Sequence, residues 1–556
     1  MVPIDFDVLI IGSGAGGGAS AWGLAQNGLK VLLLEAGPAY SPSEYQLDRS
    51  EWEQLSFPDR ARHKGRYTFG TMQNLRPELK DLRSWNHLEG YLNDTGRRAT
   101  GAYHHMRGVG GSTLVFSGEA QRLHPDAMKM RTRFGVAADW PLSYSELEPY
   151  YCLAERQLGV AGVSDTVRFR SEPYPLPAHR LSYASTKVEE GCRKLGLNLS
   201  PNPVAILSRP YDGRPECNYC AQCGRGCPRT DKGSVDVTFI RQAVETGNCF
   251  VRSECRVTAL EAGPSDRITR VTYADRAGNL HQASGRVVIV SCGAIETPRL
   301  LLTSKNSHAP DGVGNDTGQV GRHFMETLFW FSSGLHEDRL GSFRGIPVDS
   351  ICWDFNAPDS IPGVAGGCRF SPSAAEADLA GPINYAKRAV KGWGRKHKEA
   401  MRDVFGRVLV ILAMGEFLPN SKAYIDLDPL QKDDAGIRLA RINTFLDDVD
   451  IRRLAFMSQK TREILLASGV KKTFEEYSAY DMFNSSHVFG TCRMGIDPEQ
   501  SVVDQYCRSH RWKNLFIMDA SVFPSSGGGE SPSLTIEALA LRTADHINRL
   551  AKKGEL

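Results

Sequence analysis

The sequence predicts an α/β fold in which a Rossmann-like dinucleotide-binding domain is combined with a discontinuous second domain built on a mainly antiparallel sheet. Three observations predict it. Residues 8–38 contain an apolar strand, a glycine cluster, an Ala/Leu-rich helical run and a second apolar strand. Motifs rich in small residues return in the middle of the chain and near its end. Residues 322–480 instead show strands with long connections, and the last part of this range contains a helical stretch over 448–467.

Length and composition limit the classes of protein to consider. With 556 residues the chain is long for one core, so we expect two intimately connected domains. The 67 basic and 64 acidic residues give a net charge of +3, which argues against a nucleic-acid partner. No apolar run approaches the roughly 18–20 residues that a membrane span needs. We also expect no signal peptide, because the first strand begins within a few residues of Met1.

The predicted division of the chain follows these motifs. Residues 1–321 form the dinucleotide-binding domain, which includes an excursion over 38–100 above the cofactor or substrate entrance and a cysteine-rich loop at 217–227. Residues 322–480 form the substrate domain. Residues 481–556 return to the first domain.

The first glycine cluster has the spacing of a pyrophosphate-binding turn. Gly12 permits the tight turn, Gly14 lets the backbone approach a pyrophosphate, and Gly17 allows the helix to pack closely on the strand. The helix N-terminus adds unpaired N–H groups and partial positive charge. Glu35, at the end of the second strand, can accept hydrogen bonds from both ribose hydroxyls. The motif therefore predicts a bound dinucleotide, and it does not choose between NAD and FAD.

Two further motifs in the first 321 residues place small residues beside a cofactor. In the segment 107–114, small residues would let the backbone lie flat against a flavin ring, with N–H groups directed at its polar edge; a plain tight turn is the alternative. The candidate residues there are Arg107, Gly110, Gly111 and Ser112. Strands are predicted over 250–260, 268–273 and 286–290, and the last leads into a strand–turn–helix motif that contains Ala294.

Four closely spaced cysteines form the third candidate site. Cys217, Cys220, Cys223 and Cys227 have the spacing C-x2-C-x2-C-x3-C-P, which bacterial ferredoxins use to hold iron–sulfur clusters. Since the chain has one such run, three or four of these thiolates would hold a single cluster, [3Fe–4S] by preference or [4Fe–4S]. A zinc knuckle is the main alternative, although zinc sites usually draw on two separated pairs. Plain thiols or disulfides in a structural loop also remain open.

Taken together, four blocks resemble the glucose–methanol–choline (GMC) family of flavin oxidoreductases. The blocks are 12–18 with Glu35, 107–113, 293–301, and 487–495 with 519–536. They lie at both ends and in the middle of the chain, so the resemblance covers nearly all of it. It implies FAD as the cofactor and His487 as the catalytic base over the flavin N5 position. It also implies contacts to the pyrophosphate and flavin by Asp519, Ala520, Thr535 and Ile536.

The sequence departs from the family at the second active-site position. This position is commonly His or Asn just before Pro, and here it is Ser531. A serine hydroxyl can hydrogen-bond a substrate oxygen but cannot serve as a base near neutral pH. We therefore expect His487 to carry base catalysis alone, with Glu530 as a weaker candidate for assistance.

Within the family, the cysteine run and the segment 139–151 look most like the sugar dehydrogenases that pair FAD with an iron–sulfur cluster and a haem-bearing subunit. This resemblance implies a sugar or glycoside substrate, with glucoside 3-dehydrogenase activity first. It also implies a cytochrome c subunit as electron acceptor, and a small signal-bearing subunit that carries the chain to the periplasm; a cytoplasmic location is the alternative. Bacterial sterol and long-chain alcohol enzymes resemble the segment 220–240 as well, which weakens the metal assignment.

Three functions therefore remain open. The first is a dehydrogenase in which the substrate's hydride passes to flavin N5 and electrons leave one at a time through the cluster. The second is an oxygen-using alcohol or sterol oxidase with structural cysteines. The third is a non-redox lyase or scaffold subunit that binds a flavin.

Overall fold

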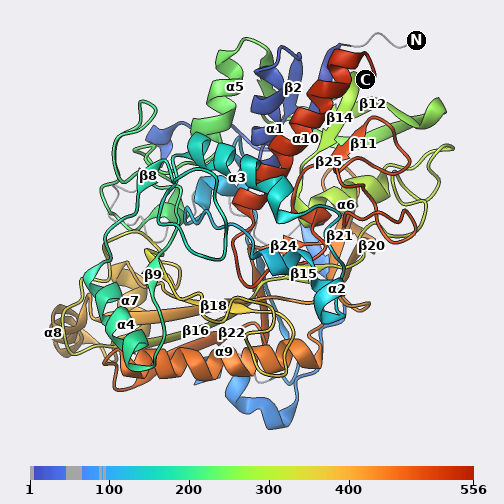
Figure 1. Ribbon diagram of the computed structural model, residues 1–556. Coiled ribbons are helices and arrows are strands. Elements are labelled where there is room, and N and C mark those ends of the chain that lie inside the picture. Colours follow the sequence, from blue (N-terminus) through green and yellow to red (C-terminus); the bar gives the residue numbers. More distant parts are fainter. Residues whose placement is uncertain (1–4, 46–65, 87–89, 92–94) are drawn as a thin grey trace.

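The computed structural model describes residues 5–45, 66–86, 90–91 and 95–556, which form two regions built on separate sheets (Figure 1). A parallel sheet with helices α1 and α10 lies in the upper part of Figure 1, and an antiparallel sheet with helix α9 lies below it. This arrangement confirms the predicted Rossmann-like domain with an antiparallel second domain. Among the described residues, no helix combines the length and apolarity that a membrane span requires.

The first sheet has five parallel strands in the order β10-β2-β1-β14-β25. Their bounds are β1 (Phe6–Ile11), β2 (Val31–Leu34), β10 (Cys249–Arg252), β14 (Gly285–Val290) and β25 (Leu515–Ile517). Parallel strands covered on both faces are continuously apolar, and all four residues of β2 are buried. Helix α1 (Ala15–Ala25) packs against the long helix α10 (Ser533–Lys553). Residues from the two ends of the chain thus build one domain.

The second large sheet is antiparallel and has the order β18-β19-β16-β22-β4-β5. Its strands are β4 (Trp85–Asn86), β5 (Gly90–Tyr91), β16 (Leu328–Leu335), β18 (Cys368–Pro372), β19 (Val408–Gly415) and β22 (Thr473–Ser478). Helix α9 (Asp448–Ala467) packs against β16 and β19 and begins and ends where the periodicity predicts. The central strand β16 contributes the fully buried Trp330 to the core.

The other helices and strands lie outside these two sheets and their covering helices. The other helices are α2 (Met130–Phe134), α3 (Tyr144–Leu158), α4 (Tyr183–Lys194), α5 (Arg241–Glu245), α6 (Gly293–Thr303), α7 (Pro382–Arg388) and α8 (Gly394–Val404). The remaining strands are β3 (Tyr67–Phe69), β6 (Ala99–Tyr103), β7 (Ala161–Gly162), β8 (Leu176–Pro177), β9 (Ser200–Pro201), β11 (Arg256–Gly263), β12 (Arg267–Ala274), β13 (Leu280–Ala283), β15 (Met325–Glu326), β17 (Ser350–Ile351), β20 (Tyr424–Lys432), β21 (Arg438–Asn443), β23 (Met482–Ser485) and β24 (Val488–Phe489).

The predicted single strand over 250–260 is wrong. The chain leaves the parallel sheet after β10 and enters the antiparallel sheet β11-β12-β13 at Arg256. The turn between them places Glu254 at a φ of +54°, and the N–H of Cys255 donates to the carbonyl of Glu35. The polar and charged residues Arg252, Ser253 and Glu254 interrupt the run at this turn, a local signal that the prediction of one continuous strand overlooked.

The predicted excursion over 38–100 is only partly described, because residues 46–65, 87–89 and 92–94 lie outside the described part of the chain. Strand β3 pairs with β21, and β4 pairs with β22. These described pieces therefore join sheets of the second region.

A buried ion pair joins the end of the 38–100 segment to strand β15, which precedes β16 of the antiparallel sheet. Both side-chain nitrogens Nη1 and Nη2 of Arg98 donate to Glu326, at 2.8 and 3.0 Å, and both side chains are fully buried. We expect Arg98→Met to lower the free energy of unfolding by about 3–5 kcal/mol, because Glu326 would be left as an uncompensated buried charge. Chemical denaturation of the purified protein measures this loss.

The matched control is the exposed pair of Arg76 and Asp448. Arg76→Met should change the unfolding free energy by no more than about 1 kcal/mol, because solvent screens this pair. Equal losses from the two substitutions would contradict the assigned role of the buried pair.

Candidate active site

The turn between β1 and α1 has the shape that a pyrophosphate requires. Gly12 has a φ of +91°, and a Cβ there would clash with the backbone carbonyl of Ser291. A Cβ on Gly17 would clash with the carbonyl of Gly12, which explains the close packing of helix on strand. Gly14 lines a large cavity, and a Cβ built on it meets no atom within 4 Å. The missing side chain of Gly14 therefore leaves space in which a phosphate can approach the backbone.

Glu35 holds this turn together from the end of β2. Its carboxylate accepts hydrogen bonds from the N–H of Ser13 (3.0 Å), the hydroxyl of Ser13 (2.7 Å) and the N–H groups of Gly37 (2.8 Å) and Gly108 (3.2 Å). Burial raises the pKa of Glu35, and these hydrogen bonds oppose the rise. Since Ser13 can direct its hydroxyl to the carbonyl of Gly108 instead (3.2 Å), one acceptor position on Glu35 is available for a ribose hydroxyl.

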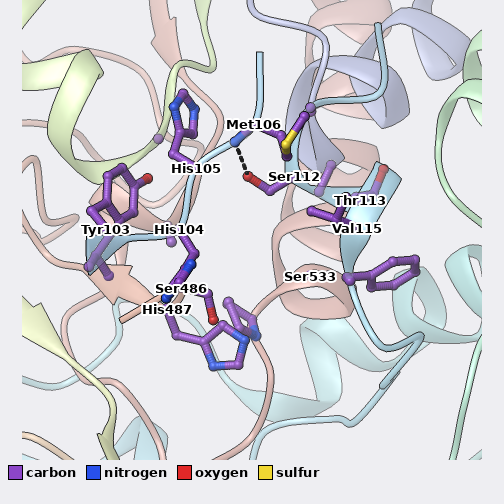
Figure 2. A pocket seen from close by; sticks show the side chains of 18 of the residues that line it. Tyr103, His104, His105, Met106, Ser112, Thr113, Val115, Ser486, His487 and Ser533 are labelled. Atoms are coloured by element: carbon purple, nitrogen blue, oxygen red, sulfur yellow. Dashed lines mark hydrogen bonds between the residues drawn. The ribbon is translucent and has the colours of Figure 1, made fainter. Parts of the chain in front are cut away.

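The second glycine motif lies directly against this turn. The N–H of Gly110 donates to the hydroxyl of Ser13 (3.1 Å), and a Cβ on Gly111 would lie 2.7 Å from the Cα of Gly14. The hydroxyl of Ser112 accepts from the N–H of Met106 (3.3 Å), as Figure 2 shows. Burial lowers the pKa of Arg107, which lines the same cavity. Gly111, Ser112 and Arg107 thus face the space above the turn.

The third motif joins α6 to the C-terminal part of the chain through Asp519. Its carboxylate accepts from the N–H of Gly293 (2.9 Å), the hydroxyl of Thr297 (2.6 Å) and the N–H of Ser521 (2.8 Å). Burial raises the pKa of Asp519, and these donors oppose the rise. Asp519 also lines the cavity, as its predicted contact with the cofactor requires.

Of the other predicted cofactor contacts, Ala294, Ala520 and Ile536 line the cavity, whereas Thr535 does not. Thr535 is fully buried, and its hydroxyl is hydrogen-bonded to that of Tyr151 at 2.8 Å. The hydroxyl of Thr535 is thus directed to α3, and its predicted place along the cofactor stays a prediction.

All of these segments surround a single cavity of about 620 Å³. The antiparallel sheet supplies an apolar wall, with Phe329, Phe331, Leu412 and Met414. The opposite, Rossmann-like side supplies the glycine motifs. A cavity of this size between two domains is typical of a cofactor and substrate site.

His487 lies between β23 and β24 and lines this cavity, near Tyr103, His104 and Ser486 in Figure 2. Its carbonyl accepts from the N–H of Thr327 (3.1 Å) and the hydroxyl of Ser485 (2.8 Å), which fixes the backbone. Its Nδ1 is buried and has no hydrogen-bond partner among the described residues. Such an unpaired buried group costs about 1–3 kcal/mol and is found at functional positions.

The electrostatic surroundings keep this imidazole neutral. Burial lowers the pKa of His487 to about 4, with Glu119 opposing the shift and Arg369 adding to it. A neutral imidazole at pH 7 can accept a proton, as a catalytic base must.

A pH profile follows from this value. We expect kcat/KM for substrate oxidation to fall as the pH drops through about 4, because protonation of His487 removes the base. Above that pH the base form is present, so no loss should occur near 6.5, the pKa of an exposed histidine. A steady-state profile measured between pH 3.5 and 8 tests this. An acidic limb centred near 6.5 would contradict the proposed burial of the catalytic ring.

Ser531 and Glu530 occupy different surroundings although they are neighbours in sequence. Ser531 lines the cavity, and its N–H donates to the side-chain oxygen of Gln121 at 2.9 Å. Glu530 does not line the cavity. It accepts from the N–H of His124 (3.0 Å) and from the side chains of Asn356 (3.0 Å) and Arg168 (3.2 Å). All three contacts involve Oε1, whereas Oε2 is buried and has no hydrogen-bond partner among the described residues. This network does not favour the predicted assistance by Glu530, which stays a prediction.

Sequence reasoning missed a polar network behind His487 and Ser531. Glu119 lines the cavity and forms a buried ion pair with Arg369 at 2.9 Å. Gln121 and Asn202 also donate to Glu119, and Gln121 accepts from Ser531. Since Glu119 and Arg369 lie 250 positions apart, no local pattern could have indicated this pair.

The four cysteines do not form a preassembled metal site. Cys217 and Cys223 are buried, Cys227 is partly buried and Cys220 is exposed. Over residues 5–45, 66–86, 90–91 and 95–556, no three or more His, Cys, Asp or Glu side chains are arranged to hold a metal ion. The thiol of Cys227 donates to Asp231 at 3.1 Å, and burial raises the pKa of Cys217 to about 12 and that of Cys227 to about 11. The predicted convergence of three or four thiolates is therefore absent from this arrangement.

The position of the cysteine loop nevertheless matters to the cavity. Ala221, Gln222, Gly224 and Arg225 line it beside the segment 111–116. The fully buried ammonium of Lys232 joins the two segments, because it donates to the carbonyls of Leu114 (2.9 Å), Phe116 (3.1 Å) and Cys223 (2.8 Å). The loop thus forms part of the cavity wall.

A glycine turn with space for a pyrophosphate, a second glycine-rich segment and a neutral imidazole around one cavity are the arrangement expected of a flavin-dependent oxidoreductase. Family comparisons agree with this class. The GMC oxidoreductase models match residues 71–326 and 419–540, and an FAD-binding-domain model matches residues 7–43. The chain belongs to the GMC oxidoreductase family, binds FAD and acts on CH–OH groups.

Relatives match over nearly the whole chain. A 2-methyl-1,2-propanediol dehydrogenase of Mycolicibacterium austroafricanum is 29% identical over 98% of this chain and 95% of its own. The fructose dehydrogenase large subunit of Gluconobacter japonicus is 30% identical over 99% and 98%, and the paromamine 6'-oxidase of Streptomyces fradiae is 30% identical over 98% and 91%.

Solved structures share the fold. A pyridoxine 4-oxidase from Mesorbium loti has a TM-score of 0.63 at 17% identity and covers 98% of this chain and 99% of its own. A formate oxidase variant of Aspergillus oryzae RIB40 has a TM-score of 0.65, also at 17% identity, with 99% of both chains covered. At such low identity this likeness concerns the fold alone.

Proposed function

We propose that this chain is an FAD-dependent dehydrogenase that oxidises a hydroxyl of a sugar or glycoside to a carbonyl, with glucoside 3-dehydrogenase activity as the first candidate. The observation that carries the proposal is the neutral imidazole of His487 at a cavity that Ser531 and the flavin-binding motifs also line. Support for a sugar comes from relatives named fructose dehydrogenase large subunit and gluconate 2-dehydrogenase flavoprotein, the latter from Pantoea cypripedii at 26% identity.

Each residue of the site has its own role in the proposed reaction. His487 accepts the proton of the substrate hydroxyl, and the hydroxyl of Ser531 hydrogen-bonds the substrate oxygen. Glu119 and Arg369 hold the polar wall behind them in place. When bound, FAD supplies the acceptor for the hydride that leaves the carbon.

The proposal includes a cytochrome c subunit as electron acceptor and a small signal-bearing subunit for co-export to the periplasm. The relative named as a large subunit supports a multi-subunit assembly. The iron–sulfur cluster is supported by the spacing of the four cysteines and by their position at the cavity wall, but not by their present geometry. The proton and hydride transfers described above do not require the iron–sulfur cluster.

A flavin-bleaching screen tests the function. The holoenzyme is mixed without oxygen with methyl glucoside, glucose, fructose, gluconate or a long-chain alcohol. We expect the fastest bleaching with the glycoside or a sugar. Bleaching by the long-chain alcohol alone would reject a sugar substrate, and no bleaching by any of them would favour a non-redox use of the scaffold.

A metal assay tests the cluster separately. Protein purified without oxygen should contain iron and acid-labile sulfide, and Cys223→Ser should lose both while FAD stays bound. Zinc alone, or no metal, would remove the cluster from the proposal.

A second candidate function is an oxygen-using oxidase of the same family. Two relatives favour it, the paromamine 6'-oxidase and the 6'''-hydroxyparomomycin C oxidase of Streptomyces lividus, which is 30% identical. Hydrogen peroxide formed with dioxygen as the sole acceptor, in stoichiometric amounts with the oxidised substrate, would establish the oxidase and reject the dehydrogenase.

A further inference from the structure

A strongly basic surface covers helices α7 and α8 and their connection. Residues 382–404, which span both helices, contain seven Lys and Arg residues and two acidic residues, Glu399 and Asp403, of which Asp403 pairs with Arg407. Trp393, between the two helices, is 89% exposed. We call the exposed cations of this segment the basic patch; they are Lys387, Lys391, Arg395, Lys396, Lys398 and Arg402. Within the described part of the chain, no carboxylate forms an ion pair with any of the six.

The positive charge of the basic patch is unfavourable at the N-terminus of helix α8. Helix α8 begins at Gly394, and its first turn contains Arg395 and Lys396 and no acidic residue. Cations at a helix N-terminus oppose the helix dipole, at about 0.3–1 kcal/mol each. No side chain caps this end either. An anionic surface laid over the patch would offset this unfavourable arrangement.

The apolar side of α8 is already covered. Ala400, Met401 and Val404 pack against a small core cluster around Tyr385 and Val408. An amphipathic helix that binds a membrane inserts its apolar side among the lipids, so this helix is not available for that mode. The exposed face offers positive charge and one aromatic residue, so the surface of an acidic protein would complement it.

The patch lies next to the cysteine loop. Phe405, which follows α8, stacks on Phe343 with ring centroids 5.0 Å apart. Two residues further on, Gly345 donates to the carbonyl of Tyr219 (2.9 Å) and accepts from the N–H of Ala221 (3.0 Å). These two partners flank Cys220, which is exposed, and Ala221 lines the cavity.

A second contact connects the same two segments. The guanidinium of Arg225, in the cysteine loop, pairs with Asp378 at 2.9 Å, four residues before α7 begins. Both residues line the cavity. A protein bound to the basic patch would therefore lie beside the part of the cavity wall that the cysteine loop forms.

We propose that the basic patch is the docking surface for an acidic electron-acceptor protein, which receives electrons across the cysteine loop. This inference rests on the proposed dehydrogenase function. Each hydroxyl oxidised releases two electrons and two protons; two one-electron ferric haem acceptors take the electrons and are reduced to ferrous haem, and the protons pass to solvent. A protein acceptor cannot enter the cavity, so complementary charge near its wall brings the two centres together and raises the encounter rate.

The test uses one haem protein in two charge forms, native mitochondrial cytochrome c, which is basic, and its succinylated form, which is acidic. The holoenzyme is first reduced with a stoichiometric amount of dithionite, so the measurement does not depend on the substrate. We expect the wild type to reduce the succinylated form at least about ten-fold faster than the native form at low salt, and to lose this preference at 0.5 M salt.

Charge reversal provides the decisive comparison. Arg395→Glu with Lys396→Glu should slow reduction of the succinylated form about ten-fold or more and should not lower the melting temperature, because acids suit a helix N-terminus. The matched control, Lys552→Glu with Lys553→Glu, changes the charge equally at the exposed end of α10, at the opposite side of the molecule in Figure 1. Reduction of a neutral benzoquinone should be unchanged in both variants.

Two results would overturn the proposal. One is an unchanged cytochrome rate in the α8 variant, and the other is an equal loss in the α10 control. If the cytochrome rate is unchanged and the wild type, but not the α8 variant, sediments with phosphatidylglycerol vesicles, the patch is assigned to a membrane instead. If no sugar bleaches the flavin but the α8 variant still loses its cytochrome rate, the proposed substrate class is refuted and the docking surface is supported.

Discussion

Replacing His487 by alanine is expected to leave FAD bound and to slow substrate-driven bleaching of the flavin by about 10²–10⁴-fold, the range that a positioned general base contributes. The reason is local. His487 lines the cavity with a ring that burial keeps neutral, whereas Ser531 cannot take a proton near neutral pH. Anaerobic stopped-flow mixing measures the bleaching, and the flavin absorption of the purified variant reports the bound FAD.

Two comparisons make this result specific. Ser531→Ala should cost less than His487→Ala, because it removes one hydrogen bond and no base. His487→Asn keeps a polar side chain of similar size and should be as slow as the alanine variant. Normal bleaching in either His487 variant would remove this residue from its role, and an equal loss in Ser531→Ala would show that the helper has been misassigned.

Replacing Gly14 by valine should produce a folded protein that does not hold FAD. Gly14 has a φ of −69°, which any residue can adopt, and a Cβ there meets no atom within 4 Å. The added side chain therefore extends into the cavity where the pyrophosphate is expected. We expect the affinity for FAD to fall at least about 100-fold, or roughly 2.7 kcal/mol. Flavin absorption per polypeptide and titration of the apoprotein with FAD measure this loss.

The melting temperature of the apoprotein separates this effect from misfolding. Apo Gly14→Val should melt with the apo wild type, and added FAD should stabilise the wild type alone, because a ligand stabilises only the state that binds it. Gly16→Ala is the contrasting control, since a Cβ there would clash with the carbonyl of Met518 and strain the fold itself. Full flavin occupancy in Gly14→Val would contradict the assigned position of the pyrophosphate.

The parts of the site that the sequence predicted are those fixed by short-range geometry. A turn that needs a φ of +91° at Gly12 and open space at Gly14 leaves a local signature of glycines, and the end of the next strand brings Glu35 beside it. The fold class followed for the same reason, because the buried parallel strands are continuous apolar runs.

The features of the site that the sequence did not predict depend on contacts between distant residues, which no local pattern indicates. Glu119 meets Arg369 across 250 residues, and Thr535 turns toward Tyr151 on another helix. Adjacent residues Glu530 and Ser531 face different surroundings, since Glu530 accepts from His124, Asn356 and Arg168 while Ser531 lines the cavity. The cysteine spacing predicts ligands that could converge, yet burial and a hydrogen bond to Asp231 give Cys227 another partner.

The strand order of the parallel sheet determines when this domain can finish folding during synthesis. Strand β14 lies between β1, near the start of the chain, and β25, which begins at Leu515. At about 5–20 residues per second, a ribosome needs on the order of 25–100 s to travel between these two strands. During that interval the nascent chain lacks β25 and Asp519, which the cofactor cavity requires. The cavity that the flavin motifs line therefore becomes complete only after the C-terminal segment with Asp519 has been made.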